Sequence, residues 1–470
     1  MALNVYNSLS RSIEKFEPLN HPHVGLYTCG PTVYNYPHIG NYRAYIFGDM
    51  LKRYLMYTGY SVKHVMNITD VDDKTIRDSI AKAMPLNELT EFYTEGFYTD
   101  LNDLNILPAN KYTKATDYIK EMLSLIEMLL EKGYAYKAED NSIYFDIKKD
   151  AGYGKLSHFN LNELKENAKG RMAKDEYEKD NAQDFALWKA WDENDGEVFW
   201  NPEIILGRGS PIGKGRPGWH IECSAMATSE LGESIDIHTG GVDLIFPHHE
   251  NEIAQSECAT GKPFAKYWMH NEWLLVEGKK MAKSAGNFYT LRDLIDKDIS
   301  PMAYRYWLYT AHYRTKTNLS LETLRGAQSA LIRLSEAFNN LSINQDNSGE
   351  DEYGVISESY KSRFLEYMDD DLNTPKALAL MWDLVKDNSI SPLDKRATML
   401  DFDKVFGFGL HIRAISNEPL PEEIKSLIIE RNYARENKDW EMSDILRAKI
   451  EVHGYEVKDT AEGTKLKKII

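Results

Sequence analysis

Residues 24–71 follow an order of patterns that few folds accommodate. The apolar run VGLYTC is followed by GPTVYNYPHIGN, whose glycines and prolines predict a loop. Apolar residues then recur at helical spacing from Phe47 to Leu55 and stop before Gly59, and the next run, SVKHVMNITDV, is typical of a strand. A strand, a loop, a helix and a second strand in this order predict a βαβ unit with parallel strands and a right-handed crossover. We therefore expect an α/β fold built on a parallel sheet.

The rest of the chain divides into parts of different character. A second amphipathic helix is predicted over residues 115–133, and a more polar stretch separates it from the apolar runs that resume at Trp219. After Lys283 the pattern becomes helical, and the last part predicts a helix, a short strand and a basic end. We predict a sheet domain in two halves, at residues 1–135 and 219–288, with an insertion between them at residues 136–218. A connection at residues 289–320, a helical bundle at 321–410 and a small C-terminal α+β domain at 411–470 follow.

Composition narrows the class of protein. The chain has 470 residues, with 56 Lys and Arg against 73 Asp and Glu, and a net charge of −17. This acidic excess argues against a general nucleic-acid coat protein, because repulsion from phosphate opposes encounter, yet RNA can still bind at local basic patches. The three cysteines are scattered, and no apolar run approaches the ~18 residues of a membrane span. We therefore expect a cytoplasmic protein with no disulfide framework and no membrane partner.

Two short motifs suit the binding of phosphate. H-I-G-N places His38, Gly40 and Asn41 at a predicted helix start, where unpaired backbone N–H groups and the helix dipole favour an anion. K-M-A-K-S, residues 280–284, offers Lys280 and Lys283 to the charge that develops on a triphosphate reacting at its α-phosphorus. Taken singly, the first motif is equally consistent with a histidine that caps a loop, and the second with an exposed basic turn. In this order, one opening the βαβ unit and one closing the sheet domain, they resemble a class I aminoacyl-tRNA synthetase.

A third group of residues has the chemistry of a metal site. Two thiolates, an imidazole and a carboxylate are an accepted tetrahedral set for zinc. The candidates come from the end of the first strand, from WHIEC and from PHHENE, and they are Cys29, Cys223, His248 and Glu252. His248 and Glu252 are four residues apart, which places them about 40° apart around a helix. His249 is an alternative ligand, and Cys258 lies roughly 240° around the helix from Glu252, so we expect it to serve packing. Taken singly, the cysteines also fit buried small hydrophobes.

Five motifs together resemble the cysteinyl-tRNA synthetase family: C-G-P-T-V-Y-N, H-I-G-N, G-W-H-I-E-C-S, T-G-G-V-D-L-I-F-P-H-H-E-N-E and K-M-A-K-S. The resemblance runs essentially from end to end and includes DLNTPKAL and RENKDW in the C-terminal half. It implies a Rossmann-like catalytic domain split by a connective insertion, a stem-contact connection, a helical bundle and a C-terminal anticodon-binding domain. Two residues depart from the wider class, because Asn41 stands where a second histidine is usual and Ala282 where a serine is usual.

The resemblance also implies an activity. Such an enzyme activates L-cysteine with ATP and Mg²⁺ to cysteinyl-adenylate and pyrophosphate, and then transfers cysteine to the 3′ end of cysteine tRNA. One zinc per chain, held by Cys29, Cys223, His248 and Glu252, would select the thiol over a serine hydroxyl, so no editing domain is needed. The charge at the α-phosphorus would be stabilised by His38, Asn41, Lys280 and Lys283. The positions expected around ATP, the amino acid and the adenylate are His38, Gly40, Thr69, Trp219, His238, Asp243 and Lys283.

Two further patterns are interpreted as structural. GKGRPG, residues 213–218, fits G-x-G-x-x-G, but it follows SPI rather than a clear strand and contains Pro217, so we do not predict a dinucleotide site. Asp70, Asp72 and Asp73 have the composition of a Mg²⁺ site. We favour a solvated loop at the end of a strand for these three carboxylates.

The resemblance finally implies partners, namely cysteine tRNA, L-cysteine and ATP, bound by a monomer. We expect the helical bundle and Lys465, Lys467 and Lys468 to grip the tRNA. One alternative is the related ligase of mycothiol synthesis, which joins cysteine to an amino sugar and needs no anticodon reader. The other is a non-catalytic, zinc-stabilised RNA-binding protein, which would have no use for His38 and Lys283.

Overall fold

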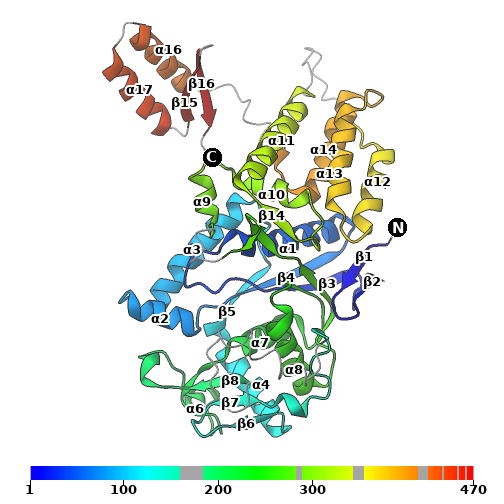
Figure 1. Cartoon of the computed structure of the whole chain (residues 1–470), viewed down its shortest axis with the longest axis vertical. Helices are drawn as coiled ribbons and strands as arrows, with labels where there is room; N and C mark the ends of the chain where they lie inside the picture. The colour runs from blue at the N-terminus through cyan, green and yellow to red at the C-terminus, as the bar shows by residue number, and fades with distance from the viewer. Residues whose placement is uncertain are drawn as a thin grey trace. The chain divides into compact units, whose positions relative to one another are not determined.

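The computed structural model of the chain forms two compact units (Figure 1). The first comprises Met1–Ala337 and Leu341–Phe408, and the second comprises Phe338–Asn340 and Gly409–Ile470. The structure describes residues 2–158, 184–281, 288–341, 354–410, 422–436, 439–452, 455–460 and 463–468. Within these ranges, no helix combines the length and the apolar character that a membrane span needs.

A five-stranded parallel sheet with strand order β11-β10-β3-β4-β5 organises the first unit. Its strands are β3 (His23–Thr28), β4 (Ser61–Ile68), β5 (Lys111–Lys114), β10 (Ile235–Gly241) and β11 (Ala265–Asn271). Helix α1 (Ile39–Tyr57) connects β3 to β4, so the predicted βαβ unit is present. The chain builds the sheet outward from β3 through β4 and β5, and later adds β10 and β11 on the other side of β3. The strand order therefore reverses between β3 and β10.

Helix α1 is buried on nearly all sides, because it packs against the sheet and against helix α14 (Pro392–Phe406). Most of its apolar residues are buried, and Ile46 and Leu51 are at most 1% exposed. The charged residues Asp49, Lys52 and Arg53 are buried as well. A helix that opens at the phosphate motif is thus buried along most of its length, and Met56 in its last turn is exposed.

The insertion forms a sheet of its own, with strand order β6-β7-β8-β9 and antiparallel pairing. Its strands are β6 (Ala135–Lys137), β7 (Ile143–Phe145), β8 (Phe185–Ala190) and β9 (Gly215–Pro217). In Figure 1 it lies on one side of the main sheet together with helices α4 (Ile119–Glu131), α6 (Pro202–Leu206), α7 (Trp219–Leu231) and α8 (Glu250–Thr260). One hydrophobic core runs through these elements and the main sheet, including Phe145, Trp188 and Trp268.

Strand β9 lies within the glycine-rich stretch GKGRPG, residues 213–218, for which we did not predict a dinucleotide site. Its edge lies very close to β8, since a Cβ on Gly215 or Gly218 would clash with the carbonyl oxygens of Lys189 and Ala186. Only glycine allows this approach of two backbones. The glycines that resemble a dinucleotide motif therefore serve strand pairing.

Helices cover the other side of the main sheet (Figure 1). The longer ones are α3 (Leu86–Asp103), α11 (Leu321–Asn340), α12 (Glu358–Asp369), α13 (Thr374–Lys386) and α14, and the shorter ones are α9 (Leu291–Ile295) and α10 (Pro301–Tyr309). Helix α2 (Asp73–Ala81) follows β4 and contacts α3. A small sheet of order β13-β12-β14 joins β12 (Leu274–Val276), β13 (Lys279–Lys280) and β14 (Thr317–Leu319). A hairpin of β1 (Asn4–Asn7) and β2 (Ser12–Lys15) lies at the N-terminal end.

The second unit contains helices α16 (Glu422–Glu436) and α17 (Trp440–Val452), followed by an antiparallel hairpin of β15 (Tyr455–Thr460) and β16 (Gly463–Lys468). We expected one helix and one short strand in this region. A second helix begins because the Asp439 carboxylate accepts a hydrogen bond from the Met442 N–H at 3.1 Å, as an N-terminal capping residue does. The basic end, including Lys465 and Lys467, pairs as the second strand of the hairpin.

Candidate active site

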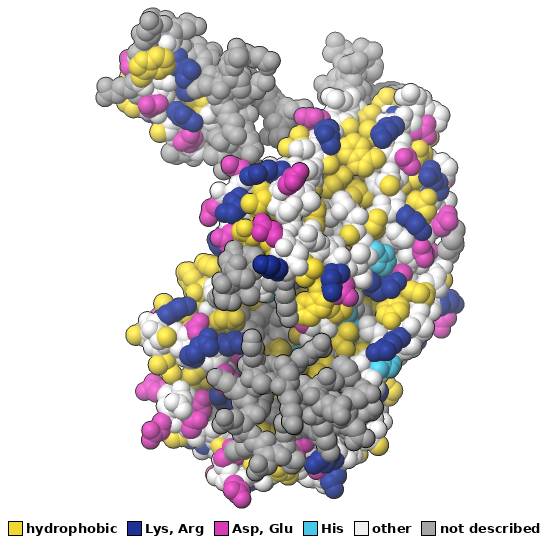
Figure 2. Space-filling view, in the orientation of Figure 1, with side chains coloured by type: hydrophobic (Ala, Val, Ile, Leu, Met, Phe, Trp, Pro, Cys, Tyr) yellow, Lys and Arg dark blue, Asp and Glu magenta, His cyan; other side chains and the backbone are white. Residues whose placement is uncertain are grey.

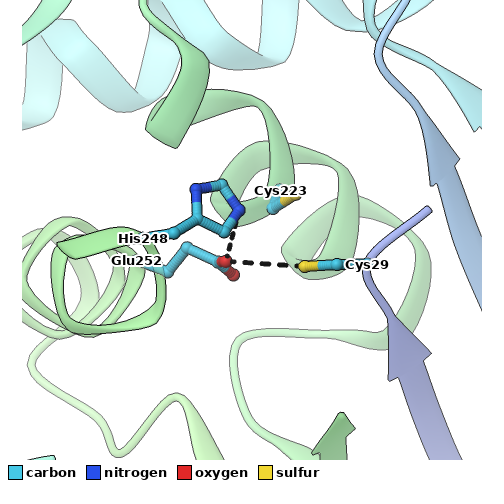
Figure 3. A group of neighbouring side chains, drawn as sticks. All are labelled: Cys29, Cys223, His248 and Glu252. Carbon is cyan, nitrogen blue, oxygen red and sulfur yellow. Dashed lines mark hydrogen bonds and ion pairs between the residues drawn. The ribbon is translucent and has the colours of Figure 1, made fainter. Parts of the chain in front are cut away.

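The candidate site lies at the carboxyl ends of β3 and β10, where the strand order reverses and parallel sheets usually bind their ligands. Cys29 follows β3 directly, and Cys223 lies on α7. His248 lies in the turn before α8, and Glu252 lies in the first turn of α8. Figure 3 shows these four side chains pointing toward one another from separate elements. Residues that are far apart in the sequence therefore meet at one end of the sheet.

The four side chains selected as metal ligands share one buried space. One ligand atom from each lies within 4.8 Å of those of the other three. Glu252 Oε1 is 3.0 Å from His248 Nε2 and 4.0 Å from Cys29 Sγ (Figure 3). Cys223, His248 and Glu252 are at most 2% exposed. The spacing and the burial are those of a site that could enclose a single cation.

The ionisation of these side chains suits a cation. Burial raises the pKa of Cys29 well above its usual value, whereas a hydrogen bond from Cys29 lowers the pKa of Cys223 to about 6. Burial alone would raise the pKa of Glu252, but His238 and His248 beside it lower that pKa to about 2. Burial likewise opposes the charge of His248, and Glu252 nevertheless raises its pKa to about 10. The site thus presents a thiolate and a carboxylate, both of which are anionic ligands of zinc.

A second group of candidate ligands overlaps the first. Cys29, His238, His249 and Glu252 also place one ligand atom each within 4.8 Å of one another. His238 Nε2 lies 2.8 Å from Glu252 Oε2, and His249 Nε2 lies 3.4 Å from Cys29 Sγ. The two groups share Cys29 and Glu252. The first group is completed by Cys223 and His248, and the second by His238 and His249.

Two histidines that we did not select from the sequence stand behind the candidate ligands. His220 Nδ1 is 2.9 Å from His248 Nδ1, and His270 Nε2 is 2.8 Å from His249 Nδ1. Partners of this kind fix the tautomer and the ring orientation of a ligating histidine. The available signal was that each lies in an apolar run, WHIEC or YWMHN, where a buried polar side chain needs a hydrogen-bonding partner.

The residues expected around the amino acid and the adenylate differ in exposure. The Trp219 ring stacks on His248 with a centroid separation of 4.2 Å and is 36% exposed. The Thr69 hydroxyl is buried and donates a hydrogen bond to Glu222 Oε2 at 2.9 Å. Asp243 lies in the turn after β10 and is exposed. Trp219 thus connects the candidate metal site to solvent, and Thr69 fixes the end of β4 against α7.

The phosphate motif H-I-G-N lies at the start of α1. His38 is the N-terminal capping residue in an extended conformation, and Asn41 Oδ1 accepts a hydrogen bond from the His38 N–H at 3.1 Å. The His38 ring meets the Phe288 ring edge to face at 5.2 Å. The first turn of the helix is therefore ordered by its own side chains and by residues that follow the lysine motif.

The lysine motif reaches the same place. A Cβ on Gly40 would lie 2.6 Å from Cε of Met281, and the Ile39 N–H donates to the Tyr289 carbonyl at 2.9 Å. Met281 inside the motif and Tyr289 after it thus lie against the first turn of α1. Lys280 ends β13. Lys283 and the side chain of Lys280 lie outside the described residues.

Comparisons with known proteins establish the family. The catalytic-domain family described as "tRNA synthetases class I (C) catalytic domain" matches residues 15–329, and the DALR domain matches residues 363–389. The chain is 46% identical to the Cysteine--tRNA ligase of Brachyspira hyodysenteriae, over 98% of each chain. The chain belongs to the cysteine–tRNA ligase family. It is also 44% identical to the Cysteine--tRNA ligase of Protochlamydia amoebophila, over 99% of this chain and 98% of the relative.

Solved structures place the fold of this family member among class I synthetases. Mycobacterium tuberculosis methionyl-tRNA synthetase in complex with methionyl-adenylate matches with a TM-score of 0.55 and 15% identity, over 84% of this chain and 92% of that one. The LeuRS of Agrobacterium radiobacter K84, in a ternary complex with tRNA and LeuAMS, matches with a TM-score of 0.57 and 10% identity, over 85% of each chain. At these identities the likeness concerns the fold alone.

The remaining candidates have structural contacts in this cysteine–tRNA ligase family member. Asp72 caps α2, and Asp70 accepts a hydrogen bond from the Thr116 N–H at 3.0 Å. Asp73 forms an ion pair with Lys189 at 2.6 Å. These carboxylates therefore hold the segment after β4 in place. Cys258 is half-buried and packs against the hydrophobic core, as predicted.

Proposed function

We propose that this protein activates L-cysteine with ATP and transfers it to the 3′ end of cysteine tRNA. The observation that carries the proposal is the joint placement of two sites. Cys29, one member of the buried set of thiol, imidazole and carboxylate groups, directly follows β3. The loop that begins there ends at the H-I-G-N helix start, and Met281 of the lysine motif lies against that helix start. Membership in the cysteine–tRNA ligase family supports the same reaction.

We propose that Cys29, Cys223, His248 and Glu252 hold one zinc ion. The donor set fits, because it has two sulfurs, an imidazole and a carboxylate within 4.8 Å and already carries anionic charge. Its histidine is oriented by His220 on the nitrogen that faces away from Glu252. When bound, zinc would coordinate the thiolate of the substrate, which it prefers to a hydroxyl. Selection of cysteine over serine then needs only one binding step.

The chain's own groups position the reaction at phosphorus. The carboxylate of cysteine attacks the α-phosphorus of ATP, the bond to the pyrophosphate oxygen breaks, and cysteinyl-adenylate forms. The backbone N–H groups at the start of α1, with His38 and Asn41, face the charge that develops, and we assign Lys280 and Lys283 to the same role. A hydroxyl at the 3′ end of the tRNA then attacks the carbonyl of the adenylate and releases AMP. No protein nucleophile takes part in either step.

The tRNA would be held by the helices after residue 320 and by the second unit. On the face shown in Figure 2, Lys and Arg side chains lie among the acidic ones despite the net charge of −17. Local basic groups of this kind support RNA binding by an acidic protein. The mycothiol ligase and the non-catalytic RNA-binding protein are not favoured, because relatives named Cysteine--tRNA ligase match nearly the full length of the chain. The three cysteines are free, which supports a reducing compartment such as the cytoplasm. We propose that the protein acts as a monomer.

The first experiment is ATP–pyrophosphate exchange with cysteine and with serine, on protein whose zinc content has been measured. We expect exchange with cysteine alone, in proportion to zinc. Charging of cysteine tRNA then separates this activity from that of the mycothiol ligase. Absence of exchange from zinc-loaded protein would contradict the proposal and favour a non-catalytic RNA-binding protein.

Two variants separate the overlapping ligand groups. Cys223→Ser removes a ligand of the proposed set only, and His249→Gln removes a ligand of the other set only. We expect Cys223→Ser to lower the zinc content and to raise the KM for cysteine without changing the KM for ATP. His249→Gln should keep its zinc. The reverse pattern of zinc contents would assign the metal to Cys29, His238, His249 and Glu252.

A further inference from the structure

Arg43 on α1 is buried, and among the described residues the hydrogen-bond acceptors of its guanidinium are three backbone carbonyls and one hydroxyl. The residue is 4% exposed. Nη1 donates to the Trp273 carbonyl and to Thr317 Oγ1, both at 2.7 Å. Nη2 donates to the Tyr313 carbonyl at 3.1 Å and to the Thr315 carbonyl at 2.6 Å. Burial lowers the pKa of Arg43 to about 10, so it stays charged near neutral pH.

The four acceptors belong to the segments that build the small sheet. Trp273 directly precedes β12, and Thr317 begins β14. These strands pair in parallel, with Leu274 opposite Thr317, and on its other edge β12 pairs with β13, with Leu275 opposite Lys280. Arg43 therefore bonds to residues at the starts of β12 and β14, and β12 pairs with the strand that ends at Lys280. A shift of these acceptors relative to α1 would move β12 and, through it, the backbone of Lys280.

The chain beyond β13 returns to the first turn of the same helix. Met281 lies against Gly40, and Tyr289 accepts a hydrogen bond from the Ile39 N–H. The Tyr304 hydroxyl on α10 donates to the Ile39 carbonyl at 2.6 Å. The segment that carries the lysine motif is thus attached to α1 on both sides. Arg43 provides the attachment on the β12 side, with four hydrogen bonds from one side chain.

We propose that Arg43 is a positioning residue that sets the lysine-bearing strand against the helix start that carries His38 and Asn41. This inference rests on the proposed function, because its effect is on the alignment of the groups around the α-phosphorus. The fork geometry is essential: a guanidinium offers five donors in a fixed plane, whereas an ammonium offers three at a single nitrogen. Lysine would keep the charge and lose the simultaneous contact with segments 273 and 313–317.

The test compares Arg43→Lys and Arg43→Met with a matched control on the same helix. Lys52 is also buried, at 6% exposed, and donates to a backbone carbonyl, that of Pro108, at 2.7 Å. We expect both Arg43 variants to lower the kcat of cysteine-dependent pyrophosphate exchange about 100-fold, the usual effect of a displacement of about 1 Å at a reacting centre. The KM for cysteine should not change, and Lys52→Met should keep the wild-type kcat. A wild-type kcat in folded Arg43→Lys, or a rise in the KM for cysteine that matches the fall in kcat, would overturn the inference.

Hydrogen–deuterium exchange provides a second readout that needs no catalysis. The amides of β12 should exchange faster in Arg43→Met than in the wild type or in Lys52→Met. Equal exchange rates in β12 would overturn the inference even if activity fell. If the wild-type protein itself lacks cysteine-dependent exchange, the proposed function fails, and the amide exchange still decides whether Arg43 holds the strand.

Discussion

The ion pairs of Asp49 give a stability prediction whose size follows from their burial. Asp49 Oδ2 accepts hydrogen bonds from Arg53 Nε at 2.8 Å and from Arg305 Nη2 at 2.5 Å. Its Oδ1 accepts from the Leu107 N–H at 2.8 Å. Asp49 is 1% exposed, Arg305 is 0% exposed and Arg53 is 8% exposed. One carboxylate therefore pairs with two arginines in the interior, between α1 and α10.

Asp49→Asn keeps the shape of the side chain and removes its charge. The amide can still accept from Leu107, but it removes the negative charge that both guanidinium groups contact and can present N–H donors to their N–H donors. Removing one partner of a buried ion pair lowers the free energy of unfolding by about 3–5 kcal/mol. With a urea slope of about 3 kcal/mol per M, a loss of about 3 kcal/mol moves the unfolding midpoint down by about 1 M.

Urea unfolding followed by circular dichroism at pH 7 measures this loss. Glu17→Gln is the matched control, because Lys15 and Glu17 form an ion pair at 2.7 Å whose side chains are both 61% exposed. We expect the midpoint of Glu17→Gln to equal that of the wild type, since solvent and salt screen an exposed pair. If Asp49→Asn shifted the midpoint no more than Glu17→Gln, the buried charges would not contribute as argued.

The same variant gives a pH dependence. Burial favours the neutral form of Asp49, but Arg305 and Arg53 outweigh it and lower the pKa of the carboxyl below its usual value. Such a group stabilises the fold above its unfolded pKa of about 3.9, and the contribution disappears as the pH falls through the lower folded pKa. The stability difference between wild type and Asp49→Asn should therefore be constant from pH 7 to about pH 5 and shrink below about pH 4. A difference that grew in acid would contradict this assignment.

Two other substitutions test the site. Gly40→Ala would place a Cβ 2.6 Å from Met281 Cε and 2.9 Å from the His38 ring. We therefore expect the kcat of pyrophosphate exchange to fall roughly 100-fold, with the KM for cysteine unchanged. A wild-type kcat in this variant would refute the close approach. His238→Gln alters the contact of 2.8 Å between His238 Nε2 and Glu252 Oε2. We expect the affinity for zinc, measured by competition with a chelator, to fall about 10–100-fold. An unaltered affinity would mean that His238 does not orient that carboxylate.

The βαβ unit and the candidate ligands could be predicted because both have specific signals in the sequence. Helical spacing between two β-rich runs defines α1, and cysteine, histidine and glutamate in metal-ligand combinations are rare enough to be selected individually. Cys29, Cys223, His248 and Glu252 do meet in the structure. The contacts do not by themselves choose between this group and the overlapping one, since both have the same spacing.

The buried charges could not be predicted, because they depend on what covers each helix. Asp49 and Arg53 lie on α1 at positions that sequence patterns assign to a solvated face. They are buried because the sheet and the helices α10 and α14 enclose α1 from opposite sides. His220 and His270 were missed for a similar reason, since a histidine in an apolar run indicates a buried polar side chain but not which residue it bonds to. Tertiary packing thus determines these residues, and local periodicity does not.

The loop between β3 and α1 joins the two chemistries of the site. Its first residues are fixed on the end of β4: the Gly30 N–H donates to Asn67 Oδ1 at 2.7 Å, and the Val33 N–H donates to the Thr69 carbonyl at 3.1 Å. A Cβ at Gly30 would clash with the Asn67 carbonyl, so only glycine lets the loop approach β4 this closely. The loop begins beside the thiol of Cys29 and ends at the capping residue of α1. Under the proposed function, a substrate held by its thiol at one end would meet the H-I-G-N helix start at a separation that the loop and β4 set together.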